Sequence, residues 1–277
     1  MYPDDTGVFE TVGAGAHYLP ASSPYRDAGT TNLDAEMFVE LARTTTGAPL
    51  VQSDVTLTTD TTWTPQAARD SDLPDLGYHY DPLDYLTKTC AVTNCTLTVQ
   101  AGTVVGSANT TGVWLQEGGN LVSVGAPAAP IWFVRYSGAQ EQPVALEGAP
   151  SAGLSVNAYH TGDPAPTARF RFTRFAAPAG GGMNLYHAYQ WSYGNLDVSD
   201  SEFYNGGTPS YNGNTNTVAR FHNNLWHRAQ FVALAPGGSA VASLAVSNNL
   251  FVGSPLVRVA QSASNPWPVY DNVFDRC

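Results

Sequence analysis

The sequence predicts an all-β fold: a single-stranded parallel β-helix, or solenoid, with one short helix near the N-terminus. Three observations predict it. A six-residue motif recurs every 23 to 25 residues in the last third of the chain. Aromatic and β-branched residues are common, and 26 glycines and 19 prolines indicate many turns. The repeated segments lack the 3.6-residue periodicity of an amphipathic helix.

The repeat is clearest in four segments that share an apolar first residue, polar central residues and a final aromatic residue. They are VSDSEF (198–203), FHNNLW (221–226), VSNNLF (246–251) and VYDNVF (269–274). Earlier, FRFTRF and IWFVRY keep the apolar ends at longer shifts of 28 and 39. A period of 23 to 25 accommodates three short strands and three turns, whereas repeats of roughly 33 residues or more form other solenoids or propeller blades.

Stacking of such coils predicts two columns of equal side chains, because equivalent positions lie above one another at about 4.8 Å. The aromatic column contains Phe203, Trp226, Phe251 and Phe274. The amide ladder contains Asn224, Asn249 and Asn272, each able to donate and accept along the stacking axis.

Composition restricts the partners. The net charge is −11, with 12 basic against 23 acidic residues, so no basic face is expected for nucleic acid or an anionic membrane surface. No apolar run approaches the ~20 residues of a membrane span. We expect no membrane insertion and no nucleic-acid partner.

The cysteines and aspartates allow further interpretations. Cys90 and Cys95 bracket four residues, a spacing that suits a small disulfide loop at a turn, with plain thiols as the alternative. No clustered Cys or His residues predict a metal site. Five aspartates around the first third of the chain are candidate ligands for Ca²⁺, although their spacing does not match a 12-residue calcium loop. These are Asp70, Asp72, Asp75, Asp81 and Asp84. No other cofactor is expected.

Several stretches resemble parts of large secreted bacterial tandem-repeat proteins built from right-handed parallel β-helix units. LTVQAGTVV (97–105), GNLVSVG (119–125) and PIWF (130–133) are similar to the first coils of such a unit. SPYRDAGT (23–30) resembles its closing stretch, and DLGYHYDPLDY (75–85) resembles the linker between units. The resemblance implies a right-handed coil, which the general preference of parallel crossovers also favours.

The resemblance also implies an order of parts. Residues 1–31 would end a preceding β-helix unit, residues 32–89 would form a short helix plus linker, and residues 90–277 would form the coils. Met37, Phe38 and Leu41 have helical spacing, with Thr31 or Asn32 as the expected cap. We expect the chain to be a segment of a longer secreted polypeptide.

Catalytic residues are not evident. A pectin-type hydrolase needs paired aspartates on adjacent rungs, and a calcium-dependent lyase needs clustered carboxylates; neither pattern occurs within the repeats. Asp200, Glu202, Asp271 and Asp275 lie on or beside motif strands, where two outward carboxylates on neighbouring rungs would approach a glycosidase spacing. A solvated acidic surface is the simpler interpretation, so the sequence favours a non-enzymatic role without excluding an enzyme.

Aromatic residues between positions 186 and 193 suggest a carbohydrate-binding platform, since exposed rings stack on sugars. They are Tyr186, Tyr189, Trp191 and Tyr193. Packing inside a turn is the alternative.

Together these observations predict a structural or adhesive extracellular or cell-surface module, part of a rod- or filament-forming protein. Its expected partners are copies of itself end to end, or neighbouring repeats of the same polypeptide. The alternative is a polysaccharide-binding or polysaccharide-degrading β-helix, with lyase- or glycosidase-like chemistry.

Overall fold

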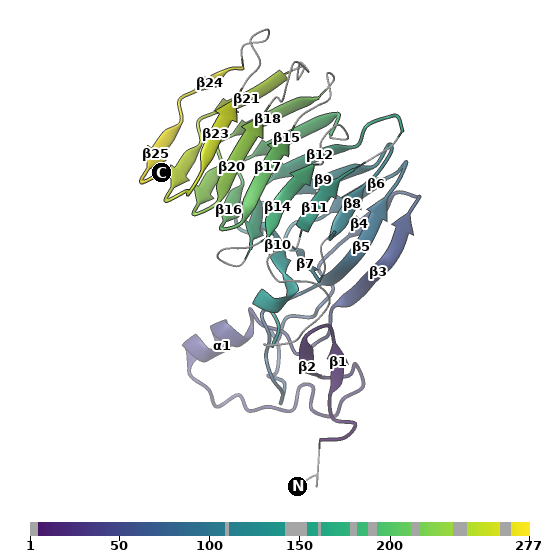
Figure 1. Ribbon diagram of the computed structural model, residues 1–277. Coiled ribbons are helices and arrows are strands. Elements are labelled where there is room, and N and C mark those ends of the chain that lie inside the picture. Colours follow the sequence, from purple (N-terminus) through teal and green to yellow (C-terminus); the bar gives the residue numbers. More distant parts are fainter. Residues whose placement is uncertain are drawn as a thin grey trace.

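The computed structural model describes residues 5–108, 111–141, 154–159, 162–177, 182–187, 193–211, 217–234, 243–260 and 267–277. Parallel strands are the main regular structure in this part of the chain (Figure 1). The predicted β-rich, parallel character is confirmed. One further sheet is a small antiparallel hairpin of β1 (Glu10–Val12) and β2 (Gly15–Tyr18).

One parallel sheet contains eight described strands in the order β24-β21-β18-β15-β12-β9-β6-β4. Their bounds are β4 (Thr61–Trp63), β6 (Thr96–Val99), β9 (Asn120–Val124), β12 (Thr167–Arg171), β15 (Asn195–Ser199), β18 (Val218–His222), β21 (Ser243–Ser247) and β24 (Val269–Tyr270).

The other parallel sheet contains 15 described strands in two arms. The first arm contains β7 (Val104–Ser107), β10 (Ile131–Arg135), β13 (Thr173–Ala176), β16 (Glu202–Tyr204), β19 (Leu225–His227), β22 (Leu250–Val252) and β25 (Val273–Asp275). The second contains β8 (Val113–Leu115), β11 (Leu154–Ala158), β14 (Met183–His187), β17 (Gly207–Tyr211), β20 (Gln230–Leu234) and β23 (Val257–Ala260).

Strand β5 (Tyr85–Val92) joins the two arms. Its first half pairs with β7 and its second half with β8. Thr89, between the halves, has φ of +58°, and this left-handed residue turns the strand from one arm into the other. Strand β3 (Leu50–Leu57) pairs along β5 and has its own left-handed residue, Asp54, at the matching position.

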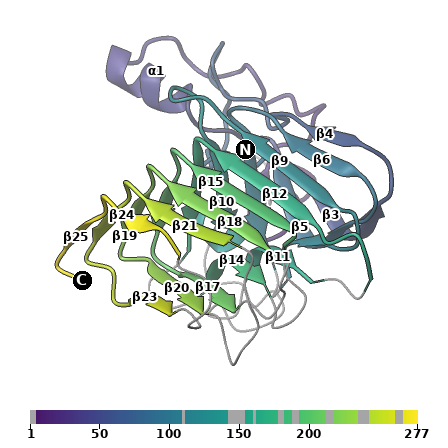
Figure 2. The same ribbon diagram turned by 90° about the horizontal axis from the view of Figure 1, so that it is seen from above.

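The strands repeat in groups of three. In the group β15, β16 and β17, each strand pairs in parallel with the strand three places later, β18, β19 and β20 respectively. The next group, β21, β22 and β23, continues the pattern. In Figure 2, β12, β18 and β21 lie on one side of the interior and β17, β20 and β23 on another.

Side chains from all three strands of a group meet in one core. Phe221, Trp226 and Phe231 come from β18, β19 and β20, and their ring centroids lie 4.9 to 6.1 Å apart. All three side chains are fully buried. The apolar interior is therefore shared by the two sheets along the whole stack.

The aromatic column runs through this core. Phe203 and Trp226 are parallel, with centroids 3.9 Å apart, and Phe251 and Phe274 follow at 5.9 and 5.0 Å. Phe175 extends the column on the other side at 4.8 Å, and Phe133 follows it at 5.3 Å. The sequence alignment of IWFVRY was wrong in register, because Phe133 pairs with Phe175 and Ile131 with Thr173.

The three asparagines lie in a row beside this column. The Asn224 amide donates to Asn249 Oδ1 at 3.0 Å, and the Asn249 amide donates to Asn272 Oδ1 at 2.9 Å. Two hydroxyl residues extend the row: the Ser201 N–H donates to Asn224 Oδ1, and the Thr173 N–H donates to Ser201 Oγ.

A left-handed residue comes before each member of this row and turns the chain between the two sheets. These residues, with φ between +47° and +57°, are Phe172, Asp200, Asn223, Asn248 and Asp271. Asn and Asp tolerate this conformation best among residues with a side chain. This explains why the third residue of the six-residue motif is Asn or Asp.

The N-terminal part lies beside the stacked strands, below them in Figure 1. It contains α1 (Ala35–Leu41), whose cap is Asp34 rather than the expected Thr31 or Asn32: the Asp34 side chain accepts from the Met37 N–H at 2.8 Å. No residue of this helix is buried. Strands β3 and β4 both lie inside the segment 32–89, so the parallel sheets begin earlier than the expected boundary at residue 90. No helix among the described residues has the length and apolarity of a membrane span.

Candidate functional site

The outward face of the first arm is hollowed. Along β10, Ile131 and Phe133 point into the core, whereas Trp132 and Val134 alternate with them and face outward. The 3-10 helix η1 (Tyr136–Gly138) follows β10 directly and forms one wall.

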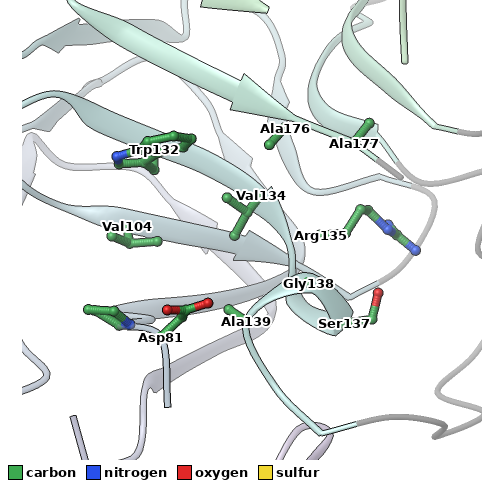
Figure 3. A pocket seen from close by; sticks show the side chains of 11 residues that line it. Asp81, Val104, Trp132, Val134, Arg135, Ser137, Gly138, Ala139, Ala176 and Ala177 are labelled. Carbon is green, nitrogen blue, oxygen red and sulfur yellow. The ribbon is translucent and has the colours of Figure 1, made fainter. Parts of the chain in front are cut away.

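The larger hollow has a volume of about 680 Å³ (Figure 3). Trp132 and Val134 of β10 lie beside Val104 of β7 and Ala176 of β13. In Figure 3, Asp81 and Arg135 lie on opposite sides of this apolar floor. Arg135 is buried, and burial lowers the pKa of its guanidinium.

A second hollow, of about 380 Å³, lies next along the same arm. It is more polar and is lined by Arg174, Glu202, Asp200 and Asn223, among others. Arg174 and Glu202 face each other from neighbouring strands and form a two-pronged ion pair, with N–O distances of 3.0 Å on both prongs. Tyr204 Oη also donates to Glu202, at 2.5 Å.

Trp132, which lines the larger hollow, lies close to Tyr204 and to Arg174 of the second hollow. The centroids of Trp132 and Tyr204 lie 6.4 Å apart at an interplanar angle of 19°, although the residues belong to β10 and β16. On β13, the strand between them, Arg174 is opposite Trp132 and the small Ala176 is opposite Tyr204. Arg174 Cζ lies 5.2 Å from the Trp132 ring centroid, within cation–π range.

Electrostatics favour the ionised form of Asp200. Partial burial raises the pKa of Asp200, but hydrogen bonds from Arg171 at 2.8 Å and Asn223 at 3.2 Å outweigh it and hold that pKa below its usual value. Burial, followed by the hydrogen bond to Glu202, raises the pKa of Tyr204, which stays a neutral donor. Asp200 therefore cannot serve as a general acid near neutral pH.

The outward carboxylates considered as a catalytic pair are dispersed. Asp200 and Glu202 lie on the same three-strand group, whereas Asp271 and Asp275 lie three groups further on. Of these four, Asp200 and Glu202 line the second hollow, and each is paired with an arginine. This arrangement suits binding better than acid–base chemistry.

One member of the aromatic platform expected around residue 190, Tyr193, is not at the surface. Tyr193 is buried to 1% exposure and faces the core, so it offers no surface to a ligand. Tyr186 lies on β14, paired with Asn157. Tyr189 and Trp191 lie outside the described residues.

The expected Cys90–Cys95 disulfide is not formed, and both residues are free thiols. Cys90 lies in β5 and Cys95 lies beyond a corner at Asn94, where φ is +51°. The Cys95 thiol donates to the Leu57 carbonyl at 3.2 Å instead. Burial raises the pKa of Cys90 to about 12, so the thiol is protonated and unreactive.

Three of the linker aspartates are engaged in internal contacts. Asp84, fully buried, accepts from Arg69 and from three backbone N–H groups at 2.7 to 3.0 Å. Asp70 contacts His79 at 2.6 Å, and Asp75 accepts from the Asp27 N–H at 2.8 Å. Asp72 and Asp81 are exposed. Across the described ranges, no group of three or more Cys, His, Asp or Glu side chains converges as a cation site would require.

Sequence reasoning missed Trp132, Arg174 and Tyr204. The available signal was the alternation within IWFVRY, which turns its Trp outward once Phe133 is assigned to the core column. Comparison with known proteins adds no assignment: no family model, curated protein or solved structure matches the chain.

Proposed function

We propose that this chain is a structural module of an extracellular or cell-surface protein: a right-handed, single-stranded parallel β-helix whose stack is continued by further rungs. Support for the coil comes from the three-strand groups, their shared core and the corners at equivalent left-handed residues. Such a stack gains length without widening, which suits a rod.

The observation that carries the proposal is the exposure of apolar side chains on the outermost group of strands, β24 and β25. Phe274 is 53% exposed, whereas its counterpart one group back, Phe251, is fully buried. Val273 and Tyr270 are exposed by 59% and 55%. These apolar side chains and the open strand edge match what another rung would bury and pair with.

The opposite end of the stack offers a second open edge. Strand β3 pairs only with β5 among the described strands, and its Leu50 and Val51 are about half exposed. Unlike edges at the two ends favour a head-to-tail contact, which repeats without closing. The occupant is another rung in parallel register, supplied by a second copy or by neighbouring repeats of one polypeptide.

Sedimentation velocity over a wide range of protein concentration tests this proposal. We expect the unaltered chain to associate as concentration rises and the Phe274→Asp variant to stay monomeric, because a charge at the edge opposes burial. Leu76→Asp, which alters a similarly exposed apolar side chain in the linker, is the matched control and should associate normally. A chain that stays monomeric throughout, or equal loss in both variants, contradicts the proposal.

A further inference from the structure

We propose that the hollowed outward face of β7, β10, β13 and β16 is a binding groove for a neutral polysaccharide, with Trp132 and Tyr204 as its stacking residues. The groove is independent of the strand edges at the ends of the stack, so this inference does not rest on the proposed scaffold role.

The aromatic pair supplies the apolar part of the site. Trp132 is partly exposed at the rim of the larger hollow, with Val104, Val134 and Ala176 beside it. A sugar ring presents a flat face of C–H groups to such a surface and directs its hydroxyls to the side. The Trp132 and Tyr204 ring centroids lie 6.4 Å apart and the ring planes are within 19° of parallel, so the two rings together form one aromatic platform.

The polar hollow supplies hydrogen-bond partners at the platform's edge. Glu202 accepts from Arg174 and Tyr204, and Asp200 accepts from Arg171 and Asn223. An ionised carboxylate has about four acceptor positions, so each retains capacity for a ligand hydroxyl. Their existing contacts fix the carboxylates in place, which lowers the entropy lost on binding.

Charge selects a neutral ligand over an acidic one. Arg174 pairs with Glu202 and Arg171 with Asp200, and Arg135 lines the larger hollow together with Asp81, so the groove offers no excess positive charge. The chain as a whole carries −11 and repels polyanions. The four strands of the groove, β7, β10, β13 and β16, span about 15 Å at the usual strand spacing, which accommodates more than one sugar unit.

Affinity electrophoresis of the full chain through gels containing a soluble polysaccharide tests the proposal. The probes are hydroxyethylcellulose, galactomannan and laminarin as neutral chains, and polygalacturonate and alginate as acidic ones. We expect at least one neutral chain to retard the protein, with little dependence on salt, and the acidic chains to leave its mobility unchanged.

Three variants locate the binding. Trp132→Ala should weaken retardation about tenfold, because the stacking surface is lost. Trp114→Ala removes another partly exposed tryptophan, on β8 of the second arm, and should bind normally. Glu202→Gln keeps the size of the side chain and should also weaken binding, so the test does not depend on one variant folding well.

Three results overturn the proposal. The first is no retardation by any neutral chain, and the second is retardation by the acidic chains alone. The third is equal loss in Trp132→Ala and Trp114→Ala, with thermal unfolding of both variants close to that of the unaltered chain.

Discussion

Asn249 shows at the scale of one residue how the stack is held in register. Its side-chain N–H groups donate to the Phe221 and Ser247 carbonyls at 3.0 Å and to Asn272 Oδ1. Its Oδ1 accepts both the backbone N–H and the side-chain amide of Asn224. An amide fits this buried position because it donates along one direction of the stack and accepts along the other.

Replacing Asn249 by Ala should therefore lower the free energy of unfolding by about 1–3 kcal/mol, since the buried Asn224 N–H loses its acceptor. Urea denaturation measures the change. Asn248→Gly is the control. Asn248 is exposed with φ of +55°, a conformation that glycine adopts freely, so the free energy of unfolding of this variant should stay nearly unchanged. Equal losses in the two variants would show that the ladder contributes nothing specific.

At the scale of elements, the hairpin β1–β2 is attached to the stack through the segment after η1. Gln140 accepts the Ala14 N–H at 2.8 Å and donates to Tyr18 Oη at 2.7 Å. Glu141 accepts from Tyr80 Oη at 2.5 Å and contacts the His17 ring. The GYHY stretch (77–80) thus packs against the hairpin, with the Tyr18 and Tyr80 ring centroids 4.3 Å apart.

This attachment should weaken in acid. Partial burial raises the pKa of Glu141, but hydrogen bonds from Tyr80 and His17 outweigh it and bring the pKa below its usual value. A lowered carboxyl pKa gives stability that is complete above the unfolded value, about 4.5, and is lost as pH falls through the folded value.

Thermal unfolding of the unaltered chain and of Glu141→Gln across pH measures this contribution. The melting temperatures of the two proteins should differ most above about pH 5, and this difference should shrink as the pH falls below about 4. Glu40→Gln, at an exposed position on α1, should show no such difference. A gap that is independent of pH would assign the effect of Glu141 to packing alone.

On the scale of the whole molecule, stability should vary along the stack, because each group of strands contacts only its neighbours. Three equivalent N–H groups allow a direct comparison: Leu225 donates to Ser201, Leu250 to Asn224 and Val273 to Asn249, all at 2.8 to 2.9 Å. Their hydrogen-bond lengths are equal, but Val273 lies on the outermost strand, β25.

Amide hydrogen exchange should therefore protect Leu225 most and Val273 least, with Leu250 between them, in dilute protein. Protection of Val273 should rise with concentration if a further rung covers β25. Mass spectrometry of peptides from these strands measures both effects. Uniform protection of the three amides would mean that the stack opens only as one unit.

The sequence by itself determined the period of the strands, the aromatic column and the asparagine ladder. These features repeat the same inward-facing residue at a fixed spacing, so the order of residues along the chain records them directly. The repeat was harder to recognise in the sequence where the residue type changed. Ser201 and Thr173 continue the ladder through hydroxyls, and Phe133 joins the column three residues before the position that the alignment of IWFVRY assigned to it.

Only the tertiary structure decided the groove, the fate of the thiols and the direction of Tyr193. The groove combines unlike outward side chains from separate strands, and Trp132 approaches Tyr204 diagonally across β13, where Arg174 is opposite Trp132 and Ala176 is opposite Tyr204. Cys90 and Cys95 are near in sequence but separated by a corner, and Tyr193 turns into the core. The direction of each side chain and the residues that it meets on other strands govern all three, and neither is recorded in local sequence order.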